Sequence, residues 1–98
     1  MIIGRSNPYR DKQPDLDLSV FDPDNSVSNL HAEIWLLNGV WRVLDLGSMN
    51  GTYINGDKLV PTHANELHNG DIVTFGKVSL EFQNGKLRSL GRRSIITY

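Results

Sequence analysis

The chain has 98 residues, of which 39% are hydrophobic and 21% charged, and its net charge at pH 7 is −1. This length fits one domain, and the near-neutral charge argues against a general nucleic-acid binder. Because cysteine is absent, a disulfide framework and a thiolate metal site are excluded. No apolar run could span a bilayer and no charged-then-apolar leader follows Met1, so we expect a cytoplasmic protein without membrane, nucleic-acid, metal or cofactor partners.

Short apolar or alternating runs follow one another along the chain, and none of them has the spacing of a helix. Strands are predicted over residues 2–4, 16–18, 32–37, 40–45, 52–54, 58–59, 72–75 and 78–83. Asn38-Gly39 predicts a two-residue hairpin, and further Asn-Gly pairs at 69–70 and 84–85 mark turns. This pattern is typical of an all-β protein, and we expect a two-sheet antiparallel β-sandwich.

Polar stretches connect the predicted strands. They span residues 6–15, 21–30, 47–52 and 61–69, and the first three are rich in Ser, Asn and Asp. The loops of a sandwich lie at its two ends and often carry function. If these three stretches meet at one end, they form a polar rim on a rigid scaffold.

The stretch DLGSMNGTYING, residues 45–56, contains two Asn-Gly pairs close together. Asn and Gly accept the positive φ angles of tight turns, so this segment must fold back on itself twice. Ser48, Asn50 and Thr52 then crowd one small loop. Hydroxyls, amides and free backbone N–H groups are the donors that a phosphate group, with its three acceptor oxygens, requires.

Four motifs occur in order: Gly4-Arg5, SNLH at 28–31, GSMNGTYING at 47–56 and GDIVTFG at 70–76. Together they resemble the forkhead-associated (FHA) domain, a β-sandwich that binds phosphothreonine peptides, over about residues 3 to 82. The resemblance implies a non-enzymatic recognition module for Ser/Thr-kinase signalling or assembly, whose partner is a phosphothreonine-containing protein or peptide. In the family the threonine methyl fills a small pocket, so phosphoserine should bind less well.

The resemblance also implies which residues meet the phosphopeptide. Arg5 matches the arginine that contacts the phosphate or supports the phosphopeptide loop, and Ser28 matches the serine that hydrogen-bonds the phosphate. Asn29 and Asn50 match residues that hold the peptide main chain. Met49 stands where the family often has Ser or Thr, so one hydroxyl donor is missing.

Three further residues are expected to support the loops. His31 matches a histidine that ties the binding loops together, and Gly51 and Thr52 resemble the structural remainder of the third motif. Ser28, His31 and Asp45 also contain the residue types of a hydrolytic triad. No glycine elbow surrounds the serine, however, so catalysis is not expected.

The predicted pocket has few cations. Asn29 replaces the Lys or Arg of many family members, which leaves Arg5 as the only cation that the motifs assign. Arg10 or Lys12, on the 6–15 loop, could supply another. The alternative function is a phosphate-independent interaction or self-assembly module on the same sandwich with a degenerate pocket.

The two ends of the chain raise a further expectation. We divide it into an FHA-like domain at 1–84 and a basic, strand-capable tail at 85–98. The family usually has a strand before the one that ends in Gly4-Arg5, and without it a sheet edge is open to pairing. The strand-like residues 93–98 could fill this gap within one chain or in a partner, which would give a homodimer through an edge strand or exchanged tails.

Overall fold

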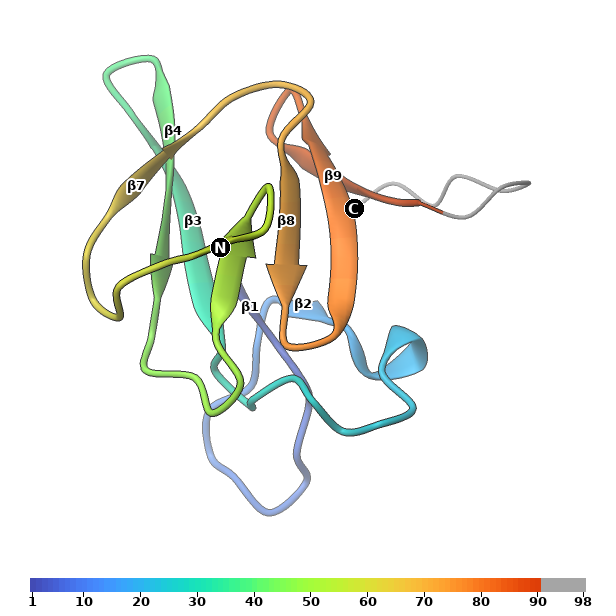
Figure 1. Ribbon diagram of the computed structural model, residues 1–98. Helices are drawn as coiled ribbons and strands as arrows, with labels where there is room; N and C mark the ends of the chain where they lie inside the picture. The colour runs from blue at the N-terminus through green and yellow to red at the C-terminus, as the bar shows by residue number, and fades with distance from the viewer. Residues whose placement is uncertain (91–98) are drawn as a thin grey trace.

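The computed structural model describes residues 1–90. In this part of the chain, the strands form two five-stranded sheets that pack together as a sandwich (Figure 1). Sheet A has the strand order β2-β1-β3-β4-β7, and sheet B the order β10-β9-β8-β5-β6. Neighbouring strands are antiparallel except β1 with β2, which are parallel. The predicted all-β sandwich is confirmed.

The strands are β1 (Ile2–Gly4), β2 (Leu16–Asp17), β3 (Ala32–Leu37), β4 (Val40–Asp45), β5 (Thr52–Ile54), β6 (Asp57–Lys58), β7 (Asn65–Leu67), β8 (Ile72–Phe75), β9 (Val78–Gln83) and β10 (Lys86–Ser89). One 3-10 turn, η1 (Ser19–Phe21), follows β2. Within residues 1–90, no helix is long and apolar enough to span a bilayer.

The β3–β4 hairpin shows how the sequence sets the register of sheet A. Asn38 and Gly39 have φ angles of 52° and 76°, and a two-residue turn with two positive φ angles matches the twist of the flanking strands. The register places Ile34 opposite Val43. Because side chains alternate between the faces of a strand, both residues then point into the core, where they are buried.

The core between the sheets is rich in aromatic and branched side chains. Phe75 and Phe82 are its largest fully buried members. Trp41 packs against the core and meets the ring of Phe82 edge to face, with ring centroids 5.7 Å apart. Burial of this apolar surface supplies the main stabilisation of the scaffold that carries the loops.

Several elements differ from the prediction. β7 lies within the stretch that was expected to be a polar loop. It was not predicted as a strand because only one of its three residues, Leu67, is buried. β10 lies in the predicted tail. Its sequence has only one buried residue, Leu87, between basic residues, so it was not predicted as a strand. Leu18 precedes η1 instead of ending a strand, and β6 lies one residue earlier than predicted. Such short elements carry too little alternation to be found by pattern.

β10 pairs with β9 at the edge of sheet B, so sheet B ends in the last strand that the structure describes. Leu87 adds a fully buried side chain to the core. The division of the chain after residue 84 stays a prediction, as does tail exchange, because residues 93–98 lie outside the described part of the chain.

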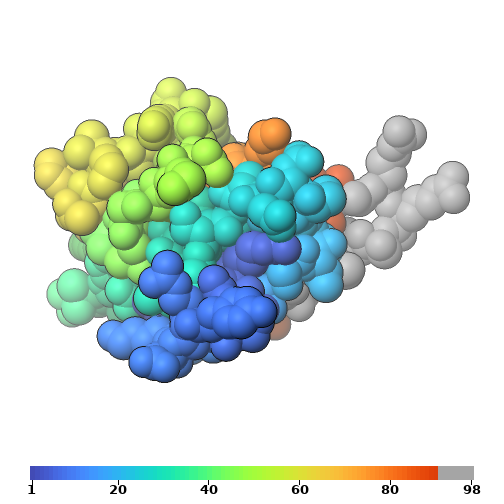
Figure 2. All heavy atoms as spheres, turned by 90° about the horizontal axis from the view of Figure 1, so that it is seen from below, coloured from blue at the N-terminus to red at the C-terminus, as the bar shows by residue number. Residues whose placement is uncertain are grey.

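Three loops gather at one end of the sandwich, at the bottom of Figure 1: the segment after β1, the segment between η1 and β3, and the β4–β5 loop. The tight β8–β9 turn lies at the same end, and the tip of the β3–β4 hairpin lies at the other. Figure 2 views the molecule from this loop end and shows the blue, cyan and green segments meeting on one face. The polar rim expected from the sequence is therefore present.

Candidate functional site

Strand β1 is fastened to the segment that carries Ser28 and Asn29. A Cβ atom on Gly4 would lie 1.9 Å from the backbone oxygen of Asn29, so only glycine allows this approach. The Arg5 N–H donates to the Ser28 and Asn29 carbonyls at 3.0 and 3.3 Å. The Asn29 side-chain amide donates back to the Arg5 carbonyl at 2.9 Å. Two motifs 24 positions apart are thus held together by backbone hydrogen bonds and by the Asn29 side chain.

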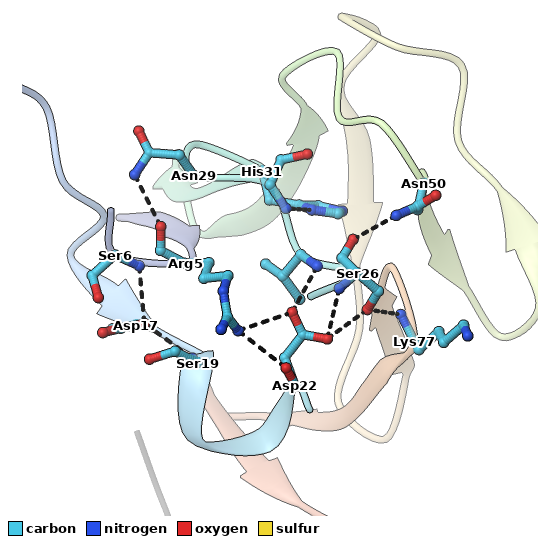
Figure 3. Close-up of polar contacts among 12 residues, drawn as sticks. Arg5, Ser6, Asp17, Ser19, Asp22, Ser26, Asn29, His31, Asn50 and Lys77 are labelled. Atoms are coloured by element: carbon cyan, nitrogen blue, oxygen red, sulfur yellow. Dashed lines mark hydrogen bonds and ion pairs between the residues drawn. The ribbon is translucent and has the colours of Figure 1, made fainter. Parts of the chain in front are cut away.

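The Arg5 guanidinium points to Asp22 (Figure 3). Its Nη1 lies 3.1 Å from the Asp22 backbone oxygen and 3.3 Å from Oδ2. Asp22 also accepts hydrogen bonds from the N–H and hydroxyl of Ser26 and from the N–H of Val27, at 2.7–2.9 Å. Burial alone would raise the pKa of Asp22, but these donors and the Arg5 charge lower it. Asp22 is therefore a charged anchor for the 22–28 loop.

Ser26 joins three loops. Its hydroxyl donates to Asp22 Oδ1 at 2.7 Å and accepts from the Lys77 N–H at 2.8 Å. Its carbonyl accepts from the Asn50 side-chain amide at 2.9 Å. Gly76 adopts a φ of 61° against it, and a Cβ there would lie 2.5 Å from the Ser26 oxygen. Sequence analysis missed Ser26 because its partners Asn50 and Lys77 are far away in the chain and no motif contains it.

His31 ties the Ser28 segment to the β4–β5 loop. It is fully buried, with Nδ1 3.0 Å from the Ser28 nitrogen and Nε2 2.8 Å from the Gly51 oxygen. A backbone N–H can only donate, so Nδ1 carries no proton and Nε2–H donates to Gly51; the imidazole is neutral. Burial lowers the pKa of His31, and this effect exceeds the opposite effect of the Gly51 carbonyl.

Asp45 organises the crowded loop of the third motif, residues 47–56. Its carboxylate accepts from the N–H groups of Gly47 and Ser48 at 2.9 and 3.1 Å, and from the hydroxyls of Ser48 and Thr52 at 2.5 and 2.6 Å. Burial would raise the pKa of Asp45, but these four hydrogen bonds lower it. The Ser48 hydroxyl in turn accepts from the Gly51 N–H at 3.0 Å. The loop therefore folds around one buried carboxylate.

An open pocket of about 290 Å³, here called the Ser28 pocket, lies between the three loops. Its lining comprises Asn7, Arg10, Asn25, Ser26, Val27, Ser28, Asn29, Met49 and Asn50. The structure thus brings four of the five residues expected to meet a phosphopeptide to one pocket. Arg5 is the fifth, and it lies outside this lining while Arg10 lies within it.

The polar groups of the Ser28 pocket are arranged by the loops around it. Ser28 Oγ accepts from the Met49 N–H at 3.0 Å, so its own hydroxyl proton remains free to turn toward a ligand. Asn50 is oriented by its hydrogen bond to Ser26. The Met49 side chain is 88% exposed and lies at the rim. The lining therefore brings the Ser28 hydroxyl together with Arg10 and four asparagines on one open surface.

The 6–15 loop holds Arg10 through a clasp made by Gln13. The Gln13 amide nitrogen donates to the Asn7 and Arg10 carbonyls at 2.6 and 2.8 Å, and its oxygen accepts from the Asn7 N–H at 2.9 Å. The Asn7 side chain accepts from the Tyr9 N–H at 2.9 Å. Gln13 and Asn7 belong to no motif. Nothing in their sequence context distinguishes them from other polar residues of the 6–15 stretch.

The hydrolytic constellation considered from the sequence is not assembled. His31 contacts Ser28 through the backbone nitrogen, and the Ser28 hydroxyl is bonded to Met49. Asp45 uses its carboxylate on the β4–β5 loop. The serine therefore has no adjacent base in this arrangement.

The FHA domain family model matches residues 1–76. The glycogen accumulation regulator GarA of Mycolicibacterium smegmatis is 43% identical over 74 residues, which cover 76% of this chain and 44% of that protein. The oxoglutarate dehydrogenase inhibitor of Corynebacterium jeikeium is 40% identical over 74 residues, covering 76% and 48%. The chain therefore spans less than half the length of these relatives.

Solved structures give the same result. The FHA-2 domain of a Mycobacterium tuberculosis ABC transporter superposes with a TM-score of 0.66 at 28% identity, covering 100% of this chain and 72% of that chain. The FhaA FHA domain, solved in complex with the intracellular domain of another protein, has a TM-score of 0.59 at 32% identity, covering 78% and 70%.

Proposed function

Since the chain belongs to the FHA domain family, we propose that it is a non-enzymatic phosphothreonine-peptide recognition module. The observation that carries this proposal is the Ser28 pocket, in which three loops bring Ser28, Asn29, Asn50 and Arg10 to one open surface. A phosphate needs a cation and several donors, and this set supplies them.

The phosphate docks in the Ser28 pocket and meets the Ser28 hydroxyl and the Arg10 guanidinium. Asn50 donates its amide N–H to Ser26, which leaves its carbonyl oxygen to accept from the main chain of an extended peptide. Asn29, fixed by its bond to the Arg5 carbonyl, does the same on its side of the pocket. Met49 covers the rim with an adaptable apolar side chain.

For Arg5 we propose the supporting one of its two expected roles. Its Nη1 donates hydrogen bonds to Asp22, which anchors the loop that carries Ser28. Arg5 then acts on the ligand through the position of Ser28. Arg10, at the tip of the clasped loop, supplies the positive charge that the phosphate meets.

Known relatives support a regulatory setting. GarA bears the name of a regulator, and the Corynebacterium relative that of an enzyme inhibitor. We propose that this chain likewise acts in the cytoplasm, binding a protein phosphorylated by a Ser/Thr kinase and presenting it to a further partner. It recognises the phosphoprotein without a chemical step, since His31 and Asp45 are both engaged in holding the loops.

A second candidate is favoured by one observation, the 88% exposure of Met49 at the rim. An apolar rim and a missing hydroxyl suit a phosphate-independent interaction or self-assembly module. The two candidates differ in one measurable property, which is whether binding depends on the phosphate.

The test is binding of a degenerate phosphothreonine peptide library, with unphosphorylated and phosphoserine versions, followed by affinities for the selected sequence. We expect phosphothreonine-selective binding that falls at least about tenfold in Ser28→Ala, because a hydrogen bond to a charged group is lost. Ser79→Ala removes an exposed hydroxyl on β9 and is the matched control. Binding that ignores the phosphate would favour the second candidate.

Two arginine variants separate direct from indirect roles. Arg10→Gln should weaken phosphopeptide binding without lowering the free energy of unfolding, since Arg10 lines the pocket. Arg5→Gln should lower both, because it also removes the contact with Asp22. Equal binding by Arg10→Gln and the unchanged chain would exclude Arg10 from the site.

A further inference from the structure

Five asparagines of this chain are each followed by glycine, and such pairs are chemically reactive. They lie at 38–39, 50–51, 55–56, 69–70 and 84–85. Because glycine has no Cβ, little obstructs the approach of its backbone nitrogen to the side chain of the preceding asparagine. That approach begins deamidation, the loss of the side-chain amide. All five asparagines are exposed, so access to water does not distinguish them.

Three of the five pairs have side-chain amides that are fixed by hydrogen bonds far from the Ser28 pocket. Asn55 Nδ2 donates to Asp71 Oδ1 at 3.0 Å, and Asn55 Oδ1 accepts from the Ile72 N–H at 2.9 Å. Asn69 Nδ2 donates to Asn84 Oδ1 at 3.1 Å, and Asn69 Oδ1 accepts from the Asn84 N–H at 2.8 Å. Each amide must leave these partners before it can turn toward the next residue.

The pair in the Ser28 pocket has both of its reacting groups engaged. Asn50 Nδ2 donates to the Ser26 carbonyl at 2.9 Å. The Gly51 N–H, which would have to attack, donates to the Ser48 hydroxyl at 3.0 Å. The crowded β4–β5 loop therefore keeps the amide of Asn50 apart from the nitrogen beside it.

Asn38-Gly39, at the tip of the β3–β4 hairpin, is the exception. Within residues 1–90, neither the Asn38 side chain nor the Gly39 N–H takes part in a hydrogen bond. A Cβ built on Gly39 would meet no atom within 4 Å, and the tip stands clear of the rest of the sandwich (Figure 1). The Asn38 amide can therefore rotate toward Gly39.

Asn55-Gly56 is a close structural match for this pair. Asn38 and Asn55 have φ angles of 52° and 50°, and the glycines after them have φ angles of 76° and 87°. A Cβ on Gly56 would also meet no atom within 4 Å. The two turns thus share backbone conformation and open space, and they differ in the hydrogen bonds of the asparagine side chain.

From this comparison we infer that Asn38 is the site at which the folded chain deamidates. The Gly39 nitrogen attacks Asn38 Cγ and forms a C–N bond. The bond between Cγ and Nδ2 breaks, and Nδ2 leaves as ammonia with the proton that the Gly39 nitrogen gives up. The product is a five-membered succinimide. Water then opens this ring at either of its two carbonyls, which leaves aspartate or isoaspartate at position 38.

The two products differ in what they do to the hairpin. Aspartate followed by glycine suits a two-residue turn as well as asparagine does. Isoaspartate adds one methylene to the main chain, so the turn no longer fits the register that places Leu37 opposite Val40. We expect the isoaspartate form to unfold more easily than the aspartate form. Both products add one negative charge to the net charge of −1.

The experiment follows all five pairs in the 98-residue chain at mildly alkaline pH. One sample is folded and the other is unfolded in urea. Peptide mass spectrometry with fragmentation gives the rate at each asparagine, and water enriched in oxygen-18 marks the products formed during the incubation. Asn38→Gly removes the reactive amide and keeps a pair that suits the turn, so it is the matched control. Asn38→Asp supplies the aspartate product as a reference.

In the folded chain, Asn38 should react at least about fivefold faster than each of the other four, because their hydrogen bonds must break before the ring closes. In urea this advantage should disappear, since all five asparagines precede glycine. Ion exchange should separate an early acidic form that Asn38→Gly does not produce. The isoaspartate part of this form should unfold at a lower urea concentration than Asn38→Asp.

Two results would overturn the inference. If Asn55 or another asparagine reacts as fast as Asn38 in the folded chain, the hydrogen bonds of the side chain do not select the site. If the folded chain stays intact while the unfolded chain reacts, the turn conformation itself prevents ring closure at Asn38. Neither result depends on phosphopeptide binding, so the proposed function is tested separately.

Discussion

Asp22 accepts four hydrogen bonds, from Arg5, Val27 and twice from Ser26, although it belongs to no motif. Its carboxylate is 1% exposed, so removing it leaves buried donors without a partner. We expect Asp22→Ala to lower the free energy of unfolding by about 2–4 kcal/mol. It should also weaken phosphopeptide binding, because the anchored loop carries Ser28.

Asp24 provides the comparison. Its carboxylate is 60% exposed and lies 3.5 Å from Lys77 Nζ, which is also exposed. Asp24→Ala should change stability by less than about 0.5 kcal/mol. Urea unfolding of both variants measures the difference, and equal costs would show that Asp22 does not anchor the loop.

Some residues of the site can be predicted from sequence motifs, and others cannot. Ser28, Asn29, Met49 and Asn50 were found through motifs, and the structure brings them to one pocket. Asp22, Ser26 and Gln13 were not found. Asp22 and Ser26 act through contacts between loops, and Gln13 acts within the 6–15 loop. Both kinds of contact depend on the folded arrangement, which a local pattern of residue types does not contain.

The same limit appears among the elements. β3 and β4 are six residues long and flank the Asn38-Gly39 turn, and their predicted bounds match the structure. β7 and β10 each bury one side chain, so their strand character comes from pairing with β4 and β9. Pairing partners distant in the chain can impose strand structure on residues of weak intrinsic preference.

β10 offers a test of how much an edge element contributes. Leu87 is fully buried, whereas Leu90, three residues later, is 50% exposed. We expect Leu87→Ala to lower the free energy of unfolding by about 2–4 kcal/mol through lost burial and the cavity left behind. Leu90→Ala should cost less than about 1 kcal/mol. Thermal or urea unfolding compares the two variants. If Leu87→Ala leaves the free energy of unfolding unchanged, the sandwich is complete without β10.

The molecule as a whole holds buried ionisable groups whose folded-state pKa values are lowered, His31 by burial and Asp45 by its hydrogen bonds. For both residue types the unfolded chain binds protons more readily than the folded one, so stability rises with pH. The contribution of His31 to the free energy of unfolding is fully present above its ordinary pKa of about 6.5. This contribution is lost as the pH falls through the folded-state pKa of His31. The aspartates add a second loss below about pH 4.

Measured as free energy of unfolding between pH 8 and pH 4.5, stability should therefore decline below about pH 6.5. His63→Gln, at an exposed position, should retain the decline, and His31→Gln should remove it. Nitrogen chemical shifts of the unchanged chain check the tautomer directly and do not depend on the folding of a variant. A proton on Nδ1 at pH 8 would contradict the assignment.

The Ser26 hydroxyl joins Asp22 to the backbone of Lys77, 51 positions later in the chain. A protein is synthesised from its N-terminus at about 5–20 residues per second. Residues 1–50 contain every side chain of the Ser28 pocket, yet in a nascent chain of that length the loop lacks its support from the β8–β9 turn. We expect the Ser28 pocket to take its final shape only after Lys77 has left the ribosome.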